Sequence, residues 1–281
     1  MRALFFSRFP AAGSLRSLAV VGSMLACLSL TGLTGCATPP PADDPEAVAE
    51  FKELNDPMEP ANRVFYAGNT FVDEAVLAPV ARGYRAVVPD GVRTGISNVL
   101  FNIGTPIRLT NDILSGKPRR AGDTTMRFFI NSTAGVLGFF DVAAGMGFVK
   151  TDSDFGLTLA SWGVEEGPFL FLPILGPSSP RDLTGYIVDQ TTDPFSWVGQ
   201  GTAVMALRWS RFGISAVSTR DRVLDPVDQI KKTALDPYAT FRSLYRQFRA
   251  AGIKKLAEDN RATIPVWFPA RAGEQINPPP R

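Results

Sequence analysis

The chain has 281 residues, with 29 basic and 27 acidic side chains, two cysteines and no histidine. The absence of histidine excludes Ser-His-Asp and Cys-His catalysis and the usual zinc sites. The near balance of charge leaves no basic stripe of the kind that binds nucleic acid, so no nucleic-acid partner is expected.

The first 35 residues have the features of a secretory signal. Three arginines and no acidic residue precede an apolar stretch over 18–33, and small residues follow before a cut, as in signal peptides. Leu33-Thr34-Gly35-Cys36 resembles the lipobox of bacterial lipoproteins, in which the cysteine thiol receives diacylglycerol and the new amino group is acylated. We therefore predict that residues 1–35 are removed and that Cys36 carries a diacylglycerol and an N-acyl chain. The alternative is an ordinary signal that ends near a cysteine by chance.

Removal of the signal leaves 246 residues with 26 basic and 27 acidic side chains. This is enough for one sizeable domain. Cys27 lies inside the signal and Cys36 would be lipidated, so the mature chain would hold no free thiol, no disulfide and no cysteine-based metal site.

Residues 36–54 begin with the lipidated cysteine and are rich in Pro, Ala and acidic residues, which predicts a flexible tether. The folded part is expected over 55–252. Asp56-Pro57 looks like a helix start, with Asp as N-cap, Pro at N1 and Glu59 at N3. We interpret the later Asp-Pro pairs, at 193–194, 225–226 and 236–237, in the same way.

Helical periodicity predicts helices over 89–103, 203–218 and 238–250, and for 203–218 it favours a helix over strands. Thr105-Pro106 and the break at 116–118 predict two further helices, over 105–114 and 118–133. Strand signals are scarce, and an all-α fold of short amphipathic helices is therefore expected. The last of these helices carries an apolar stripe that we interpret as core (Phe241, Leu244, Tyr245, Phe248), with arginines opposite it (Arg242, Arg246, Arg249). Residues 253–281 are expected to form a partly disordered tail.

Two segments are unusually apolar, 126–148 and 167–176. Neither is a spanning helix, because polar residues and glycines interrupt the first and the second is short and holds two prolines. A buried core and a surface in contact with lipid both remain open for them.

The charged pairs are interpreted as structural. Glu165-Glu166 reads as a solvated turn rather than an acid–base pair. Asp152 and Asp154 lack the rest of a calcium loop. The basic pairs 119–120 and 231–232 are expected at solvated helix ends.

A series of short motifs runs through about residues 55–250. They are Asn55-Asp56-Pro57-Met58-Glu59-Pro60-Ala61-Asn62-Arg63, Val88-Pro89, Gly95-Ile96-Ser97-Asn98, Arg127-Phe128-Phe129-Ile130-Asn131-Ser132-Thr133, Gly138-Phe139-Phe140-Asp141-Val142-Ala143, Phe155-Gly156, Thr158-Leu159, Trp162-Gly163-Val164, Gly167-Pro168-Phe169, Leu172-Pro173, Gly176-Pro177, Arg181-Asp182 and Asp236-Pro237-Tyr238. In this order and at these intervals the motifs resemble those of the MlaA (VacJ) lipoproteins. Asn69 and Phe71 also keep the character of the Asn/Phe-rich run that often follows the family's opening motif.

The resemblance implies a ring-like helical bundle in the inner leaflet of the outer membrane, with a central amphipathic channel. It implies no enzyme activity and no cofactor. The transported ligand would be phospholipid from the outer leaflet, and the partners would be a trimeric porin, the phospholipid membrane and a soluble periplasmic lipid-binding protein (MlaC-like). The candidate channel-lining or membrane-contact residues are Asn69, Phe71, Phe128, Phe129, Asn131, Phe139, Phe140, Phe169 and Phe171.

Two alternatives stay open. The protein could be a structural scaffold of the envelope that positions a porin without moving lipid. A carboxylate-dependent lipid hydrolase would need two facing carboxylates, for which Asp141, Glu165 and Glu166 are the nearby candidates.

Overall fold

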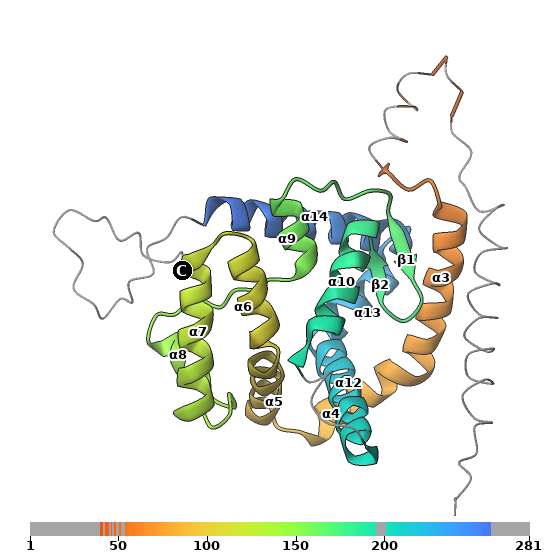
Figure 1. The fold of residues 1–281 in the computed structure, drawn as a ribbon. Coiled ribbons are helices and arrows are strands. Elements are labelled where there is room, and N and C mark those ends of the chain that lie inside the picture. The colour runs from red at the N-terminus through yellow and green to blue at the C-terminus, as the bar shows by residue number, and fades with distance from the viewer. Residues whose placement is uncertain are drawn as a thin grey trace, which may run out of the picture. The chain divides into compact units, whose positions relative to one another are not determined.

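The computed structural model describes residues 40–41, 43–44, 46, 48, 51, 54–194 and 201–259. Within these ranges the regular structure is helical except for one small hairpin, which confirms the predicted all-α fold. The signal, Cys36 and the chain from residue 260 lie outside the described residues. The elements are α3 (Glu59–Val72), η1 (Asp73–Leu77), α4 (Ala78–Val87), α5 (Asp90–Ile103), α6 (Thr105–Leu114), α7 (Pro118–Thr133), α8 (Val142–Gly145), α9 (Phe155–Ser161), β1 (Leu170–Leu172), β2 (Gly176–Ser178), α10 (Pro180–Thr192), α12 (Thr202–Arg222), α13 (Leu224–Thr233) and α14 (Pro237–Glu258) (Figure 1).

The predicted helices α5, α6, α7 and α12 are found at or near their expected bounds, and α14 is longer than predicted. Asp236 caps α14 by accepting a hydrogen bond from the Ala239 amide, and Pro237 occupies the first turn. The helix then continues through Glu258, so the region assigned to the tail begins as helix. The turn between α6 and α7 holds Gly116 at φ +67°, and Lys117 N–H donates to the Asp112 carbonyl, as in a Schellman C-cap.

The chain divides into two compact units, residues 1–64 and 65–281. In the first unit Asp56 is buried and accepts a hydrogen bond of 2.8 Å from the Asn62 amide group. Helix α3 begins at Glu59, two residues later than the Asp-Pro pair predicts, and it continues to Val72 in the second unit. The pair at 225–226 lies in the first turn of α13, which begins at Leu224, and 193–194 follows the end of α10.

In the second unit a stretch of π-helix, η1, separates the end of α3 from α4 without a break in the helical backbone. Pro79 has no amide hydrogen to donate to the carbonyl one turn earlier, and an irregular winding before it is the expected response. π-Helical turns are rare and occur frequently at functional sites.

Helices α9, α10 and α14 pack together, and two glycines permit the α9–α10 crossing. A Cβ added at Gly185 would lie 2.3 Å from the Gly156 backbone nitrogen, so no side chain fits between the two backbones. Arg249 of α14 reaches both of the other helices through Asp154 and Asp182. The crossing is thus fixed by close backbone contact and by buried charge.

The hairpin pairs Leu170 with Ser178 and Leu172 with Gly176 in antiparallel register. Its inward side chains, Phe169 and Phe171, form an aromatic cluster with Tyr238 of α14. Among the described residues, none of the helices combines the length and the apolar character needed to cross a bilayer.

Candidate functional site

Helix α7 buries polar side chains and exposes apolar ones. Arg120, Thr124, Arg127 and Asn131 follow one stripe at helical spacing, and each is at most 7 % exposed. On the other side Phe129 is 59 % exposed. This distribution is opposite to that of a helix on a water-soluble domain.

Each member of the buried stripe has polar partners. The Arg127 guanidinium donates to both carboxylate oxygens of Asp141 at 2.7 Å and to the Phe148 carbonyl at 2.7 Å. The Asn131 side chain donates to Asp141 at 3.0 Å and accepts from the Ala143 amide at 2.9 Å. These bonds connect α7 to α8 and compensate the cost of burying charge.

The buried acids respond to their surroundings in opposite directions. Burial raises the pKa of Asp141, but hydrogen bonds from Arg127 and Asn131 and the positive charge of Arg127 outweigh this and hold the pKa below its usual value. For Asp112, which is fully buried, burial dominates over the hydrogen bonds from Ser153 and Thr124, and the pKa is raised. Asp141 is therefore held as a carboxylate by its partners rather than poised as a general acid.

The same inversion extends over the described part of the chain. The buried set comprises 22 polar or charged residues and only 11 apolar ones, four of which are alanine. Thirty large apolar residues are exposed. Domains that are surrounded by water bury mainly apolar side chains, so this distribution is the reverse of the usual one.

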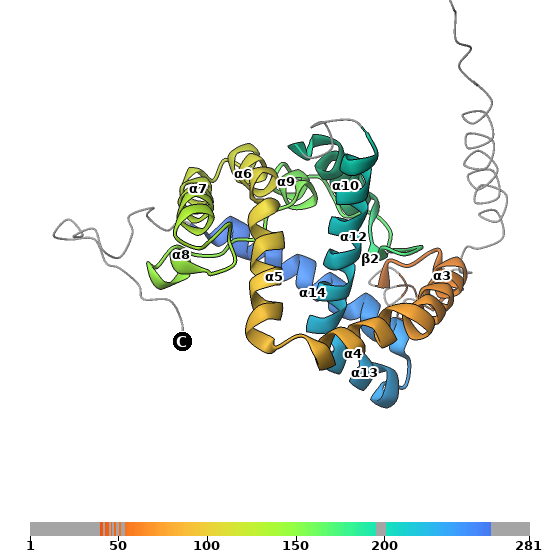
Figure 2. The ribbon, with the colours of Figure 1, turned by 90° about the horizontal axis from the view of Figure 1, so that it is seen from below.

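The most exposed apolar groups of α12 and of the loop after α7 form what we call the apolar rim, defined by Val136, Leu137, Phe140, Met205, Leu207, Trp209 and Phe212. Figures 1 and 2 show that the end of α7, the α4–α5 junction and the start of α12 lie on the side of the second unit away from α14. The segments that carry the rim therefore begin on that side of the unit.

The rim loop has a constrained backbone. Val136 and Leu137 have φ values of +52° and +56°, a region that side-chain-bearing residues rarely adopt, and Gly138 follows at +94°. Hydrogen bonds from the Leu137 and Gly138 amides to the last turn of α7 hold this shape. The loop thus presents apolar side chains outward on a strained but well-anchored turn.

The predicted site residues separate into three groups. Phe71, Phe129 and Phe140 are exposed, at 73 %, 59 % and 57 %. Phe128 and Phe139 are half-buried, and each packs edge-to-face on its exposed neighbour. Asn131 belongs to the buried stripe.

The expectation for Phe169 and Phe171 is wrong as far as lipid contact is concerned. Their side chains are 1 % and 6 % exposed, and both rings pack against Tyr238 within 6.3 Å between centroids. At the tip of the same hairpin Ile174 and Leu175 are exposed. Alternation along the short strand turns the phenylalanines inward, whereas the apolar side chains at the tip are exposed.

Asn69 has a structural role. Its amide group donates to the Leu172 carbonyl at 2.8 Å, and its side-chain oxygen accepts from the Ile174 amide at 2.8 Å. These two bonds connect α3 to the hairpin tip, where Ile174 has φ +68°.

We expect Asn69→Ala to destabilise this connection by about 1–3 kcal/mol, because two backbone groups lose their partner. Hydrogen exchange of the amides of residues 172–175 would increase well before global unfolding. Gln247→Ala, at an exposed position of α14, is the control and leaves exchange at the tip unchanged. Unaltered protection in Asn69→Ala would show that the tip is held by other contacts.

Two expectations about charged residues are corrected. Arg120 is buried at 4 % exposure rather than at a solvated helix end, and Lys231 pairs with Asp73 at 2.9 Å. On α14, Arg242 and Arg249 are buried while Phe248 is 71 % exposed. The stripe of α14 predicted to be core is only partly buried: Phe241 and Tyr245 are half-buried, with Tyr245 packed on the aromatic cluster, whereas Leu244 and Phe248 are exposed.

Several residues were missed by the sequence analysis. The rim residues of α12 carried a signal, since Met205, Trp209 and Phe212 share one helical face. The Arg127–Asp141 pair and the ion pairs around Asp73 carried none, because they join residues that are distant in the sequence.

The fold and the site define a helical protein that turns apolar side chains outward and polar side chains inward. The family model of the MlaA lipoprotein matches residues 54–252. The chain is 35 % identical over 229 residues to the intermembrane phospholipid transport system lipoprotein MlaA of Haemophilus influenzae, covering 80 % of this chain and 87 % of that protein. With the protein of the same name in Escherichia coli K12 it shares 32 % identity over 225 residues, covering 78 % and 84 %.

A solved structure, described as "Structural basis for maintenance of bacterial outer membrane lipid asymmetry", matches with a TM-score of 0.60 and 31 % identity. The match covers 70 % of this chain and 98 % of that one. The chain therefore belongs to the MlaA lipoprotein family, a family of intermembrane phospholipid transport.

Proposed function

We propose that this protein removes mislocalised phospholipids from the outer leaflet of the outer membrane and passes them to a soluble periplasmic carrier. The body would form a ring in the periplasm-facing leaflet, with an amphipathic channel, and would be bound to a trimeric porin. No chemical step on the lipid is part of this function. The family membership and the names of the relatives support the proposal.

The single observation that carries the proposal is the inverted distribution of side chains. An apolar rim that includes Leu137, Phe140 and Leu207 suits contact with acyl chains. The buried polar stripe of α7 holds the neighbouring segments together behind that rim through ion pairs and hydrogen bonds. With no described helix long and apolar enough to span the bilayer, insertion into one leaflet is the arrangement that fits these helices.

The anchor would be the acylated Cys36. Each buried CH₂ of an acyl chain adds about 0.8 kcal/mol to membrane binding, so several chains on one cysteine make release into water negligible. The acyl chains would fix the location, and burial of the rim would fix the orientation.

The test is Phe140→Asp in cells whose own copy of the gene is deleted. A charged side chain at the centre of a helix in hydrocarbon costs about 2.5–3.5 kcal/mol, so the rim would leave its position. We expect outer-leaflet phospholipid, measured by surface labelling of intact cells, to rise to the level of the deletion strain. Leu235→Asp is the matched control, because Leu235 is fully exposed between α13 and α14, outside the rim, and it should behave as wild type.

Phe140→Asp, Leu235→Asp and wild type must be present at equal levels in the membrane fraction for the comparison to hold. Normal asymmetry in Phe140→Asp would count against the proposal. If asymmetry stayed normal while the porin no longer co-purified, a scaffold that positions the porin would be the better account.

A further inference from the structure

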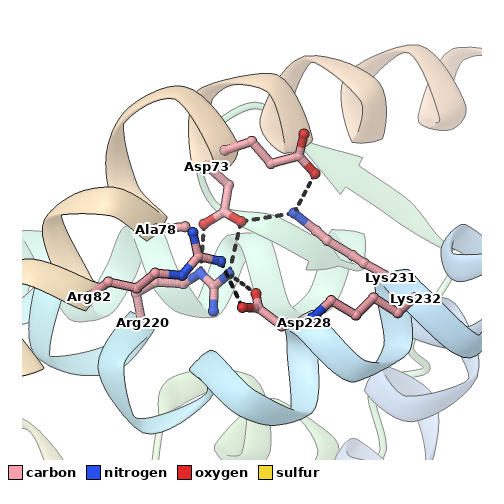
Figure 3. A pocket seen from close by; sticks show the side chains of 8 residues that line it. Asp73, Ala78, Arg82, Arg220, Asp228, Lys231 and Lys232 are labelled. Carbon is pink, nitrogen blue, oxygen red and sulfur yellow. Dashed lines mark hydrogen bonds and ion pairs between the residues drawn. The ribbon is translucent and has the colours of Figure 1, made fainter.

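A charged pocket lies between η1 and the ends of α12 and α13 in the second unit (Figure 3). Its volume is about 270 Å³. This is slightly below the range of about 300–1,000 Å³ that is usual for small-molecule sites, so it suits a small polar group and not an acyl chain. The lining residues are Asp73, Glu74, Ala78, Arg82, Arg220, Asp228, Lys231 and Lys232.

The floor of the pocket is fixed by ion pairs. Buried Arg220 donates to the two carboxylate oxygens of Asp73 at 2.6 and 3.1 Å and to Asp228 at 3.2 Å. Lys231 donates to Asp73 at 2.9 Å and to Glu74 at 3.2 Å. Burial raises the pKa of Asp73, but the hydrogen bonds and charges of Arg220 and Lys231 outweigh it and lower the pKa. The floor is therefore a connected network of ion pairs in which Asp73 is favoured as the carboxylate.

Three charged side chains at the pocket are exposed and have atoms that can still bind a ligand. The Arg82 side chain is 56 % exposed and uses one nitrogen for Asp228, at 2.7 Å. Lys232 is exposed, and it has no ion pair or hydrogen bond within the part of the chain that the structure describes. The Glu74 carboxylate is 62 % exposed and shares one oxygen with Lys231. The pocket thus offers two cations and one carboxylate to a ligand.

The pocket also lies where the apolar surface ends. Along α12 five large apolar side chains are exposed between Met205 and Ile214, with the polar Arg208 and Ser210 exposed among them. Arg220 reaches the pocket six residues after Ile214. At 1.5 Å per residue this is about 9 Å along the helix axis. If the rim is in hydrocarbon, the pocket is at the depth where headgroups begin.

We propose that this pocket binds the headgroup of a zwitterionic phospholipid, with Arg82 and Lys232 on the phosphate and Glu74 on the ammonium group. Guanidinium and ammonium groups of side chains bind phosphate well. The Glu74 carboxylate would bind the ammonium group of a zwitterionic headgroup, which a purely anionic headgroup lacks. The inference rests on the proposed function and names the headgroup class for it.

The test uses the full mature chain in a non-ionic detergent and isothermal titration with three probes: dihexanoylphosphatidylethanolamine, dihexanoylphosphatidylglycerol and inorganic phosphate. We expect the double variant Arg82→Gln/Lys232→Gln to bind both lipids at least tenfold more weakly. Glu74→Gln should lose affinity for the ethanolamine lipid several-fold and keep its affinity for the glycerol lipid. Lys255→Gln, an exposed cation on α14, is the control and should match wild type.

Inorganic phosphate should bind wild type at least tenfold more weakly than the ethanolamine lipid. If phosphate binds as well as the lipid, the pocket is a site for free phosphate and the headgroup proposal is overturned. If the pocket variants bind lipid as well as wild type does, the proposal that the pocket binds the headgroup is overturned, but the proposed function is not affected. A wild-type protein that binds neither lipid counts against both.

Discussion

Arg249→Leu should lower the free energy of unfolding by about 3–5 kcal/mol, the usual cost of removing one partner from a buried ion pair. Arg249 is 8 % exposed, and its guanidinium contacts Asp154 at 2.7 Å and Asp182 at 2.7 Å. The leucine would remove the cation that the two carboxylates share, and among the described residues Asp182 would keep an ion pair only with Arg181 of its own helix, at 3.1 Å.

The effect should depend on pH with a defined sign. Burial raises the pKa of Asp154, but the hydrogen bonds and charge of Arg249 outweigh this and lower it. A lowered pKa in the folded state stabilises the fold at pH values above the usual aspartate value near 4, and this contribution is lost as the pH falls below that value. The difference between wild type and Arg249→Leu should therefore be largest at neutral pH and shrink in acid.

Urea unfolding in detergent, followed by circular dichroism at pH 7 and pH 3, measures both the loss of unfolding free energy and its dependence on pH. Lys255→Leu on the same helix controls for the loss of a cation and should change stability by less than about 0.5 kcal/mol. Adding Asp154→Asn and Asp182→Asn to Arg249→Leu should recover part of the loss, since the unpaired charges are then removed. Wild-type stability in Arg249→Leu would mean that water or detergent already screens the two carboxylates.

Gly185→Ala should destabilise the protein by about 1–3 kcal/mol, although alanine is the better helix former. The added methyl group would meet the Gly156 nitrogen at 2.3 Å and its Cα at 2.7 Å. Both are backbone atoms, so relief requires the α9–α10 crossing to open, and overpacking of this kind costs a few kcal/mol.

Replacement of glycine by alanine at Gly213 should instead stabilise the protein. Gly213 lies inside α12, and a Cβ there meets no atom within 4 Å. Alanine should then stabilise the helix by about 0.5–1 kcal/mol, because glycine loses more backbone entropy on folding. Thermal unfolding of both variants against wild type measures the two effects. A loss of stability at both positions would show that the crossing is not the reason.

Much of the fold could be predicted from local signals. The pairs Thr105-Pro106 and Asp236-Pro237 and the helix-terminating Gly116 locate helix ends, because their side chains and backbone preferences act on the nearest turn. The helical period then gives the length of each element. The hairpin was missed, because its strands of three residues are too short to show alternation.

The candidate site could be predicted less well, for two physical reasons. Periodicity shows that a helix has two unlike faces but not which face meets the solvent, so Arg120 and Phe248 were assigned as they would be in water. Ion pairs such as Asp73–Arg220 join residues 147 positions apart, and no local pattern of charge encodes that choice of partner. Phe140 was predicted because the family resemblance pointed to it.

The loop after α7 shows a trade-off between folding and affinity for the bilayer. Glycine at 136 and 137 would adopt the left-handed backbone without strain, so valine and leucine there cost about 1–3 kcal/mol each. Glycine would also remove two side chains that are 61 % and 71 % exposed. The sequence thus keeps a less stable turn and retains two exposed apolar side chains. Under the proposed function, contact of these side chains with acyl chains would offset that cost in the membrane.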